Sequence, residues 1–142
     1  YRLPYRNGSF DAAVASEILE HLEKPEEALD EIARVVRPGG WIILSTPCNE
    51  RIEEIRCIHC NKKTPVNAHL HSFDEHTLAN LLKTAGFVPR RIVKFVNRPM
   101  ERVGMAGFTG ILPYPAWRML DAFFCRMLSR ESFIAVRAER NA

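Results

Sequence analysis

The feature that most constrains this chain is residues 10–45, in which a strand, a helix, two glycines and a second strand follow one another. Residues 10–15 (FDAAVA) form an unbroken apolar run of strand length, which indicates a buried strand rather than an edge facing water. A helix is predicted from Pro25, a residue that suits an early helical position, and it ends at residues 37–40 (RPGG). Residues 41–45 (WIILS) follow as a second buried strand. This order predicts a βαβ unit with parallel strands and a right-handed crossover.

Helices and strands continue to alternate further along the chain. Ser72 and Glu75 have the spacing of a capping box, which predicts a helix that starts there and ends at Gly86. Residues 91–96 and 132–137 are predicted as strands. The 142 residues suffice for one domain with its own core, so these elements belong to a single unit.

An apolar helix is predicted at residues 115–128, and with the Gly- and Pro-rich link before it this helix makes up a segment at 99–130. Apolar residues recur on one face of the helix: Trp117, Leu120, Phe124 and Met127. Three interpretations are open, one of which is that the helix, with Arg118, Arg126 and Arg130, lies along a membrane surface. The other two concern the protein itself. The helix is a cap over a pocket for an aromatic or lipophilic substrate, or it serves core packing or a dimer contact.

Charge and cysteine content narrow the class of protein. A net charge of +3 with scattered Lys and Arg argues against nucleic-acid binding, which needs a clustered basic face. No apolar run approaches the roughly 20 residues of a membrane span, and nothing at the start resembles a signal peptide. With four cysteines and no export signal, we expect a cytoplasmic protein without membrane contact.

Several segments together resemble the class I, Rossmann-like S-adenosylmethionine-dependent methyltransferases of type 11. Residues 3–11 (LPYRNGSFD) are similar to the lead-in of that family, and residues 10–47, with SEILEHL and the PGG turn, to its central portion. Residues 71–87 (HSFDEHTLANLLKTAGF) are similar to its next helix. The resemblance covers roughly residues 3–96 and 131–138. It implies an α/β fold, a partial Rossmann-like methyltransferase sheet of C-terminal strands with flanking helices and a small Cys/His-rich insertion.

The resemblance implies an enzyme that moves a methyl group from S-adenosylmethionine to a small-molecule acceptor. Because the chain begins at Tyr1, inside the matched lead-in, we expect residues 1–142 to be the C-terminal part of a methyltransferase domain and to be inactive alone. The glycine-rich cofactor loop would then lie upstream. Gly104, Gly107 and Gly110 do not replace it, since their spacing is wrong and Pro113 follows. The alternative is a non-catalytic zinc-binding or partner-binding module.

Five residues are expected at the cofactor by resemblance. Leu3 and Pro4 would lie near the adenine, and Ala15, Ser16 and Glu17 would line the methionine side.

The residues Glu17, Glu20 and His21 come just after the first predicted strand, where open α/β sheets bind ligands. On a helix they would share one face, and two carboxylates with an imidazole there can bind a divalent cation or supply a general base. SEILEHL resembles ubiquinone-pathway O-methyltransferases, in which the matching residues hold a divalent cation. The alternative is that the LEH element binds no metal and His21 packs or forms hydrogen bonds.

A second group of chemically active residues lies in the irregular stretch that follows, predicted as a zinc-knuckle insertion at 48–72. Cys57 and Cys60 have the Cys-x-x-Cys spacing of a zinc site, and His69 and His71 follow. The pattern resembles a zinc knuckle in some methyltransferases, with Cys57, Cys60 and His69 at matching positions. The fourth ligand stays open among His71 and two others, Cys48 and His59. The alternatives are free thiols or a redox pair.

Without upstream strands, the strand at residues 10–15 would present an unpaired apolar edge. We therefore expect self-association along it, or another segment covering it.

Overall fold

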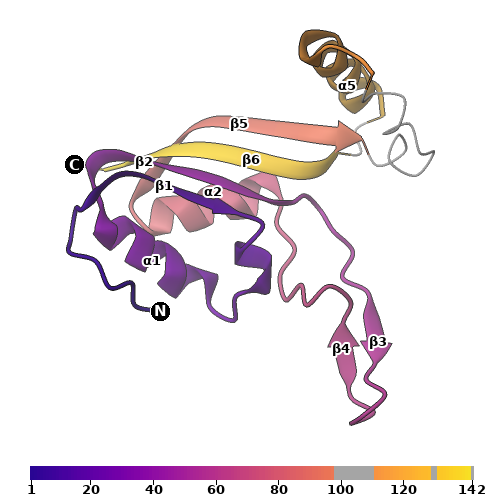
Figure 1. Ribbon diagram of the computed structural model, residues 1–142, viewed down its shortest axis with the longest axis horizontal. Helices are drawn as coiled ribbons and strands as arrows, with labels where there is room; N and C mark the ends of the chain where they lie inside the picture. The colour runs from indigo at the N-terminus through magenta and orange to yellow at the C-terminus, as the bar shows by residue number, and fades with distance from the viewer. Residues whose placement is uncertain (98–110, 129–130, 142) are drawn as a thin grey trace.

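The computed structural model describes residues 1–97, 111–128 and 131–141, and these residues form a mixed α/β fold (Figure 1). Its main sheet has the order β1-β2-β6-β5, with strands at Phe10–Ser16 (β1), Val36–Pro47 (β2), Phe87–Asn97 (β5) and Glu131–Arg140 (β6). β1 and β2 are parallel, whereas β6 is antiparallel to both β2 and β5. The helix α1 (Pro25–Val35) connects the parallel pair. The predicted βαβ unit is confirmed, as is the α/β class.

The core lies between the sheet and the two helices α1 and α2 (Glu75–Thr84), which cover the same face (Figure 1). Strand residues alternate between the two faces, and those that point toward the helices are almost fully buried. The largest members of the core cluster are Leu19, Leu29, Ile42, Leu44, Leu78, Leu82, Phe87, Ile134 and Val136. On the opposite face, Val14 and Ile43 are 69% and 46% exposed.

Two expectations apply to the first strand, a buried strand and an unpaired apolar edge, and the described sheet agrees with the second. The strand lies at the edge of the sheet and pairs only with β2 among the described strands, so it is not buried on both sides. Phe10 is 37% exposed and the side chains of Asp11 and Ala12 are also exposed. An apolar run shows which residues are apolar, but it does not show how many neighbouring strands pair with them.

The second strand starts directly after α1, five residues earlier than predicted. The pairing jumps from Phe10–Val36 to Ala12–Trp41, so the PGG turn is an irregularity inside the strand. A Cβ atom on Gly40 would lie only 2.7 Å from the carbonyl oxygen of Asp11 and 2.7 Å from Cγ1 of Val36. Glycine is therefore required where the two strands approach each other.

The predicted start of the second helix is wrong by two residues. The N-cap of α2 is Asp74, whose carboxylate accepts from the amide of Thr77 at 2.7 Å while the Thr77 hydroxyl accepts from the amide of Asp74 at 2.9 Å. Ser72 and Glu75 do not form the box, because buried Phe73 still bridges to Cys48 in extended conformation. The helix ends as predicted: Gly86 has φ +82°, the left-handed conformation of a helix stop.

The segment at 48–72 is not wholly irregular as predicted. It contains a short antiparallel pair, β3 (Glu54–Arg56) and β4 (Lys63–Pro65), and this hairpin projects away from the main sheet (Figure 1). A 3-10 turn, η1 (Leu19–His21), follows β1.

The predicted apolar helix is α5 (Tyr114–Leu128), which packs beside β5. Trp117, Leu120 and Phe124 on its predicted apolar face are half-buried, but Met127 is exposed. The predicted link at 99–110, with Gly104, Gly107 and Gly110, lies outside the described residues. Across the described ranges, no helix is long and apolar enough to cross a membrane.

Candidate functional site

The carboxyl ends of the parallel strands β1 and β2 bring Ser16, Glu17 and Ser45 together. The hydroxyls of Ser16 and Ser45 lie 2.8 Å apart, and Ser45 Oγ donates to Glu17 Oε1 at 2.8 Å. Glu17 has φ +50°, a left-handed conformation that is uncommon for a residue other than glycine. Such a conformation at the edge where α/β sheets bind ligands marks a constrained position.

The carboxyl group of Glu17 has a pKa above its ordinary value. Burial raises its pKa, and the nearby carboxylate of Glu20 adds to this effect, while the hydrogen bond from Ser45 and the imidazoles of His69 and His21 oppose it. A carboxyl group whose pKa is raised is a better proton acceptor than an ordinary glutamate.

Glu20 is buried, with only 1% of its surface exposed, and its two carboxylate oxygens differ in their hydrogen bonding. Oε2 accepts from the Thr46 hydroxyl at 3.1 Å, whereas buried Oε1 has no hydrogen-bond partner. His21 Nε2 lies 4.0 Å from that oxygen. The turn of η1 thus places a carboxylate and an imidazole side by side, although Glu17 lies outside this turn.

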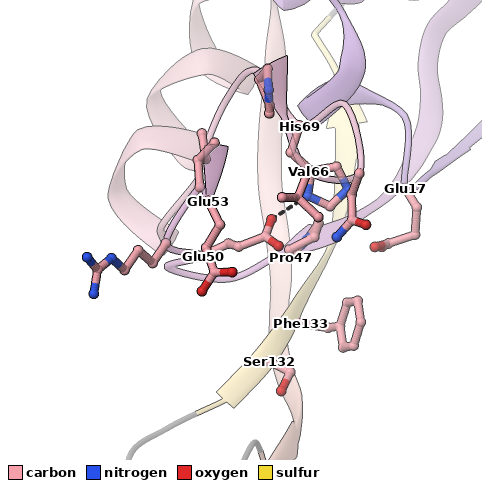
Figure 2. A pocket seen from close by; sticks show the side chains of 12 residues that line it. Glu17, Pro47, Glu50, Glu53, Val66, His69, Ser132 and Phe133 are labelled. Carbon is pink, nitrogen blue, oxygen red and sulfur yellow. Dashed lines mark hydrogen bonds and ion pairs between the residues drawn. The ribbon is translucent and has the colours of Figure 1, made fainter. Parts of the chain in front are cut away.

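His69, at the end of the insertion, joins these two residues. Its ring lies edge-on to that of His21, with 4.7 Å between centroids. Its Nδ1 donates to the carboxylate of Glu50, an interaction drawn in Figure 2. Ligand atoms of Glu20, His21 and His69 all lie within 4.8 Å of one another, and in the described part of the chain this is the group of three that could hold a metal ion.

A cavity of about 810 Å³ opens beside this group, between the end of β2, the insertion and the start of β6 (Figure 2). Its polar lining includes the side chains of Glu17, Glu50 and His69. Apolar side chains, with Val66 and Phe133 among them, form other parts of the wall. Its size is within the range of small-molecule sites, about 300–1,000 Å³.

The predicted zinc ligands do not meet in one place. Cys57 and Cys60 lie at the tip of the hairpin, where the Cys57 amide donates to the Lys62 carbonyl at 2.9 Å. His69 is held by Glu50, and His71 Nε2 donates to the Leu22 carbonyl at 2.8 Å. These contacts place both histidines beside η1 instead of at the hairpin tip.

One of the two cysteines, Cys57, has a thiol with a lowered pKa. Hydrogen bonds from the backbone of Cys60 and of His59, and one with the Cys60 side chain, lower the pKa of the Cys57 thiol. Thiolate character favours both metal binding and oxidation.

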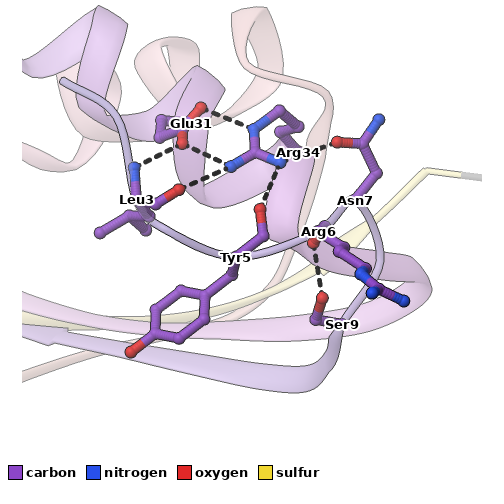
Figure 3. A network of polar contacts seen from close by, with 7 residues as sticks. All are labelled: Leu3, Tyr5, Arg6, Asn7, Ser9, Glu31 and Arg34. Carbon is purple, nitrogen blue, oxygen red and sulfur yellow. Dashed lines mark hydrogen bonds and ion pairs between the residues drawn. The ribbon is translucent and has the colours of Figure 1, made fainter.

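The predicted cofactor residues lie on two separate elements. Ala15, Ser16 and Glu17 lie at the end of β1 and beyond it, with Ala15 buried. Exposed Leu3 and its neighbour Pro4 belong to the N-terminal segment, which is tied to α1 (Figure 3).

The ties of the N-terminal segment come from two residues that the sequence analysis missed, Glu31 and Arg34. Glu31 Oε1 accepts from the Leu3 amide at 2.7 Å, and Arg34 donates to the Leu3 and Tyr5 carbonyls at 3.1 and 2.8 Å. An acid–base pair at i, i+3 on a helix was the only signal available. Glu50 and Thr46 were missed as well, although both lie near the carboxyl end of a predicted strand.

Residues 3–91 match the family described as methyltransferase domain. A probable S-adenosylmethionine-dependent methyltransferase of Mycolicibacterium smegmatis is 36% identical over 86 residues, which cover 60% of this chain and 31% of that protein. The ubiquinone biosynthesis O-methyltransferase of Dechloromonas aromatica is 29% identical over 101 residues, or 67% of this chain and 44% of the relative. The chain thus spans less than half the length of either relative.

The fold also has solved counterparts. The crystal structure of a SAM-dependent methyltransferase from Thermotoga maritima superimposes with a TM-score of 0.61 at 18% identity, over 99% of this chain and 60% of the other. At this identity the likeness concerns the fold alone.

Proposed function

The chain belongs to the methyltransferase-domain family that its residues 3–91 match, and from this premise we propose that the protein transfers a methyl group from S-adenosylmethionine to a small-molecule acceptor. The observation that carries the proposal is the position of Glu17 at the carboxyl ends of β1 and β2, where it lines a cavity of about 810 Å³ and interacts electrostatically with Glu20 and His21. Ligands of open α/β sheets bind at this edge.

The residues proposed for the cofactor are Leu3, Pro4, Ala15, Ser16 and Glu17. The exposed Ser16 hydroxyl and the half-buried Glu17 carboxylate offer oxygen atoms to a ligand at the strand ends, a donor set that fits a polar, charged cofactor. S-adenosylmethionine, when bound, supplies an activated methyl group for in-line displacement. The protein then has mainly to position the acceptor and exclude water.

His21, Glu17 and Glu20 are proposed as the catalytic group. His21 Nδ1 donates to the Ala68 carbonyl at 3.2 Å, which leaves the lone pair on Nε2 to orient or deprotonate an acceptor. Glu17, with its raised pKa, can hold a proton at the same edge. Glu20 is too buried to reach a substrate directly, so its proposed role is to set the charge around His21.

The acceptor is proposed to have an apolar body and one polar reacting atom. This matches a cavity with Val66 and Phe133 on its apolar wall and Glu17 and His69 on its polar wall. Oxygen is the attacked atom that the ubiquinone biosynthesis O-methyltransferase relative supports.

Binding of S-adenosylhomocysteine tests this function. The compound is titrated calorimetrically into the 142-residue chain and into a version that extends it upstream, because the glycine-rich loop is expected there. We expect heat of binding with the extended protein and little or none with the chain alone. If neither the extended protein nor the chain gives heat or a thermal shift, the proposed function is wrong.

A zinc-binding or partner-binding module is the second candidate, and the Cys57–Cys60 pair supports it. The pair lies at the tip of a projecting hairpin, and the pKa of the Cys57 thiol is lowered. Metal content of the wild type is compared with that of a Cys57→Ser, Cys60→Ser variant. If the zinc content is unchanged in the variant, neither cysteine is a zinc ligand.

We also propose that the chain associates with a second copy of itself along β1. The strand is an edge in the described sheet, and its Phe10 and Val14 side chains are exposed. Exposed apolar edges pair with other chains, and a lysine there opposes pairing. Light scattering after size exclusion should show dimers or larger species that Val14→Lys reduces. A wild-type chain that is already monomeric would contradict this proposal.

A further inference from the structure

The guanidinium of Arg34 directs its N–H donors to its helix neighbour Glu31 and to the N-terminal segment (Figure 3). Two of its nitrogens donate to the two carboxylate oxygens of Glu31 at 2.8 and 2.6 Å. The other donors reach the carbonyls of Leu3 and Tyr5, at 3.1 and 2.8 Å, and Asn7 Oδ1 at 2.7 Å. These contacts use every donor that a guanidinium offers. Such a planar fork fixes direction as well as distance, which a single ammonium group does not.

Glu31 completes the attachment of the segment. Its Oε1 also accepts from the Leu3 amide at 2.7 Å, so Leu3 is held at both its amide and its carbonyl. At the other end of the segment, the Gly8 amide donates to the Arg34 carbonyl at 2.9 Å. Glu31 and Arg34 lie one turn apart on α1, and their side chains are only 12% and 30% exposed. The backbone from Leu3 to Gly8 is therefore anchored to the helix at several points.

The apolar side chains of the anchored segment are left in solvent. Leu3 and Tyr5 are 38% and 51% exposed, and Pro4 between them is exposed as well. Burial of these side chains therefore contributes little to holding the segment, and the polar contacts of its backbone hold it instead. A fixed backbone whose apolar side chains face solvent presents a ready-made contact surface to a ligand.

The segment also runs toward the edge of the sheet at which ligands bind. From Gly8, near the end of α1, it follows the helix back toward its start, and Tyr1 lies close enough to Lys24 for an electrostatic interaction (Figure 1). α1 begins shortly after η1, which follows the carboxyl end of β1. Ligands of open α/β sheets lie outside the carboxyl ends of the strands. Leu3 and Pro4 can therefore contact the part of a ligand that extends from the strand ends toward α1.

We propose that Glu31 and Arg34 are positioning residues of the cofactor site, which hold Leu3 and Pro4 in place for the adenine ring of S-adenosylmethionine. The inference rests on the proposed function. Adenine is flat and has apolar faces, which suits exposed Leu3 and Pro4, whereas the charged amino-acid end of the cofactor suits the polar groups at the strand ends. Because the segment is ordered before the ligand arrives, binding does not include the entropic cost of ordering it.

Calorimetric titration of S-adenosylhomocysteine into variants of the upstream-extended protein tests the inference. Arg34→Lys keeps the positive charge but loses the planar fork, and it should weaken binding about 10- to 100-fold, the equivalent of ordering one or two residues. Glu31→Gln keeps one acceptor oxygen and should weaken binding by less, about 3- to 10-fold. The matched control is Asp30→Asn, an exposed position on the same helix, which should leave the affinity unchanged.

Nitrogen-15 relaxation of the Leu3 amide separates a positioning role from a general loss of stability, which circular dichroism measures in parallel. In the wild type this amide should be ordered with and without ligand. In Arg34→Lys it should be disordered in the free protein and become ordered when S-adenosylhomocysteine binds.

Wild-type affinity in Arg34→Lys would overturn the inference, and so would a Leu3 amide that stays disordered in the complex of that variant. Should Arg34→Lys fail to fold, Glu31→Gln decides by the same two measurements. An extended wild type that binds no S-adenosylhomocysteine has a different meaning, because it removes the proposed function and this inference together with it.

Discussion

The main sheet and the insertion at 48–72 are held in place by different forces. In the sheet and its helices, side chains such as Leu29, Leu44 and Phe87 are fully buried, and apolar burial stabilises the arrangement. In the insertion, Ile55 and Ile58 are 59% and 92% exposed. That segment returns to the sheet through a few polar contacts.

Those polar contacts converge on one short turn, η1. Within the turn, the Glu20 carbonyl accepts from the amides of Leu70 and His71. The Leu22 carbonyl, directly after the turn, accepts from the imidazole of His71. Apolar burial is non-directional, whereas hydrogen bonds fix orientation, so the core sets overall stability and the insertion sets the positions of a few polar groups. The proposed site lies at the boundary between the two regions.

The largest effect is expected from the core. Leu44→Ala should lower the free energy of unfolding by about 2–5 kcal/mol, because it leaves a cavity under α1 and α2. Chemical denaturation measures the change. The matched control is Ile43→Ala on the open face, where about 1 kcal/mol or less is expected because the side chain is 46% exposed. Equal losses at both positions would contradict the assignment of the buried face.

A smaller loss is expected where the insertion joins the core again, at the start of α2. Asp74→Ala removes the N-cap and should cost about 0.5–2 kcal/mol in thermal or chemical unfolding. Ser72→Ala, two residues earlier, should have almost no effect. A larger loss of stability in Ser72→Ala than in Asp74→Ala would instead support the capping box predicted from the sequence.

Within the insertion, a local effect is expected. His71→Ala removes the hydrogen bond to the Leu22 carbonyl, worth about 0.5–1.5 kcal/mol. Amide exchange at Leu70 should become faster, while exchange at core amides such as Leu44 should change little. His76→Ala is the control. Uniform loss of protection would show that the insertion and the core unfold as one unit.

The smallest effect concerns the N-terminal segment, which resembles the insertion in being held by polar contacts. The hydrogen bonds from Arg34 and the Leu3 amide lower the pKa of Glu31 to about 2, below its ordinary value of 4.5. Its stabilising contribution is therefore complete above pH 4.5 and is lost as the pH falls from 4.5 through about 2.

Nuclear magnetic resonance of the Leu3 amide follows this transition. Its signal should move toward the value of an unstructured chain over that pH range. In Glu31→Gln the signal should be almost independent of pH. A transition centred near pH 4.5 in the wild type would show that the Arg34 contact does not hold in solution.

Much of the core could be predicted from sequence, since local patterns determine it. Short-range signals mark the strands and the helix ends. They are the apolar residues on both sides of the helix Pro25–Val35, the glycines that follow it, and Gly86. The start of α2 could not be placed, since Ser72 and Asp74 are both good caps. The choice depends on Phe73, which bridges to Cys48 on a distant segment.

The candidate site was predictable only in part. Glu17, Glu20 and His21 were located because they directly follow a strand. His69 was grouped with Cys57 and Cys60 by sequence spacing, but its partner is Glu50, 19 residues upstream. Partners of this kind depend on how the chain folds back, which spacing alone does not reveal.

The close approach at Gly40 has a consequence at the opposite end of the strand. That glycine fixes which residue of β2 faces which residue of β1, and the same alignment puts Ser45 opposite Ser16 roughly 16 Å away, at about 3.3 Å per residue. A shift by one residue would turn Ile42 and Leu44 outward and separate the two hydroxyls. Gly40 touches no ligand, yet it determines the register of β1 and β2. Its replacement would separate the hydroxyls of Ser16 and Ser45 although neither serine is changed.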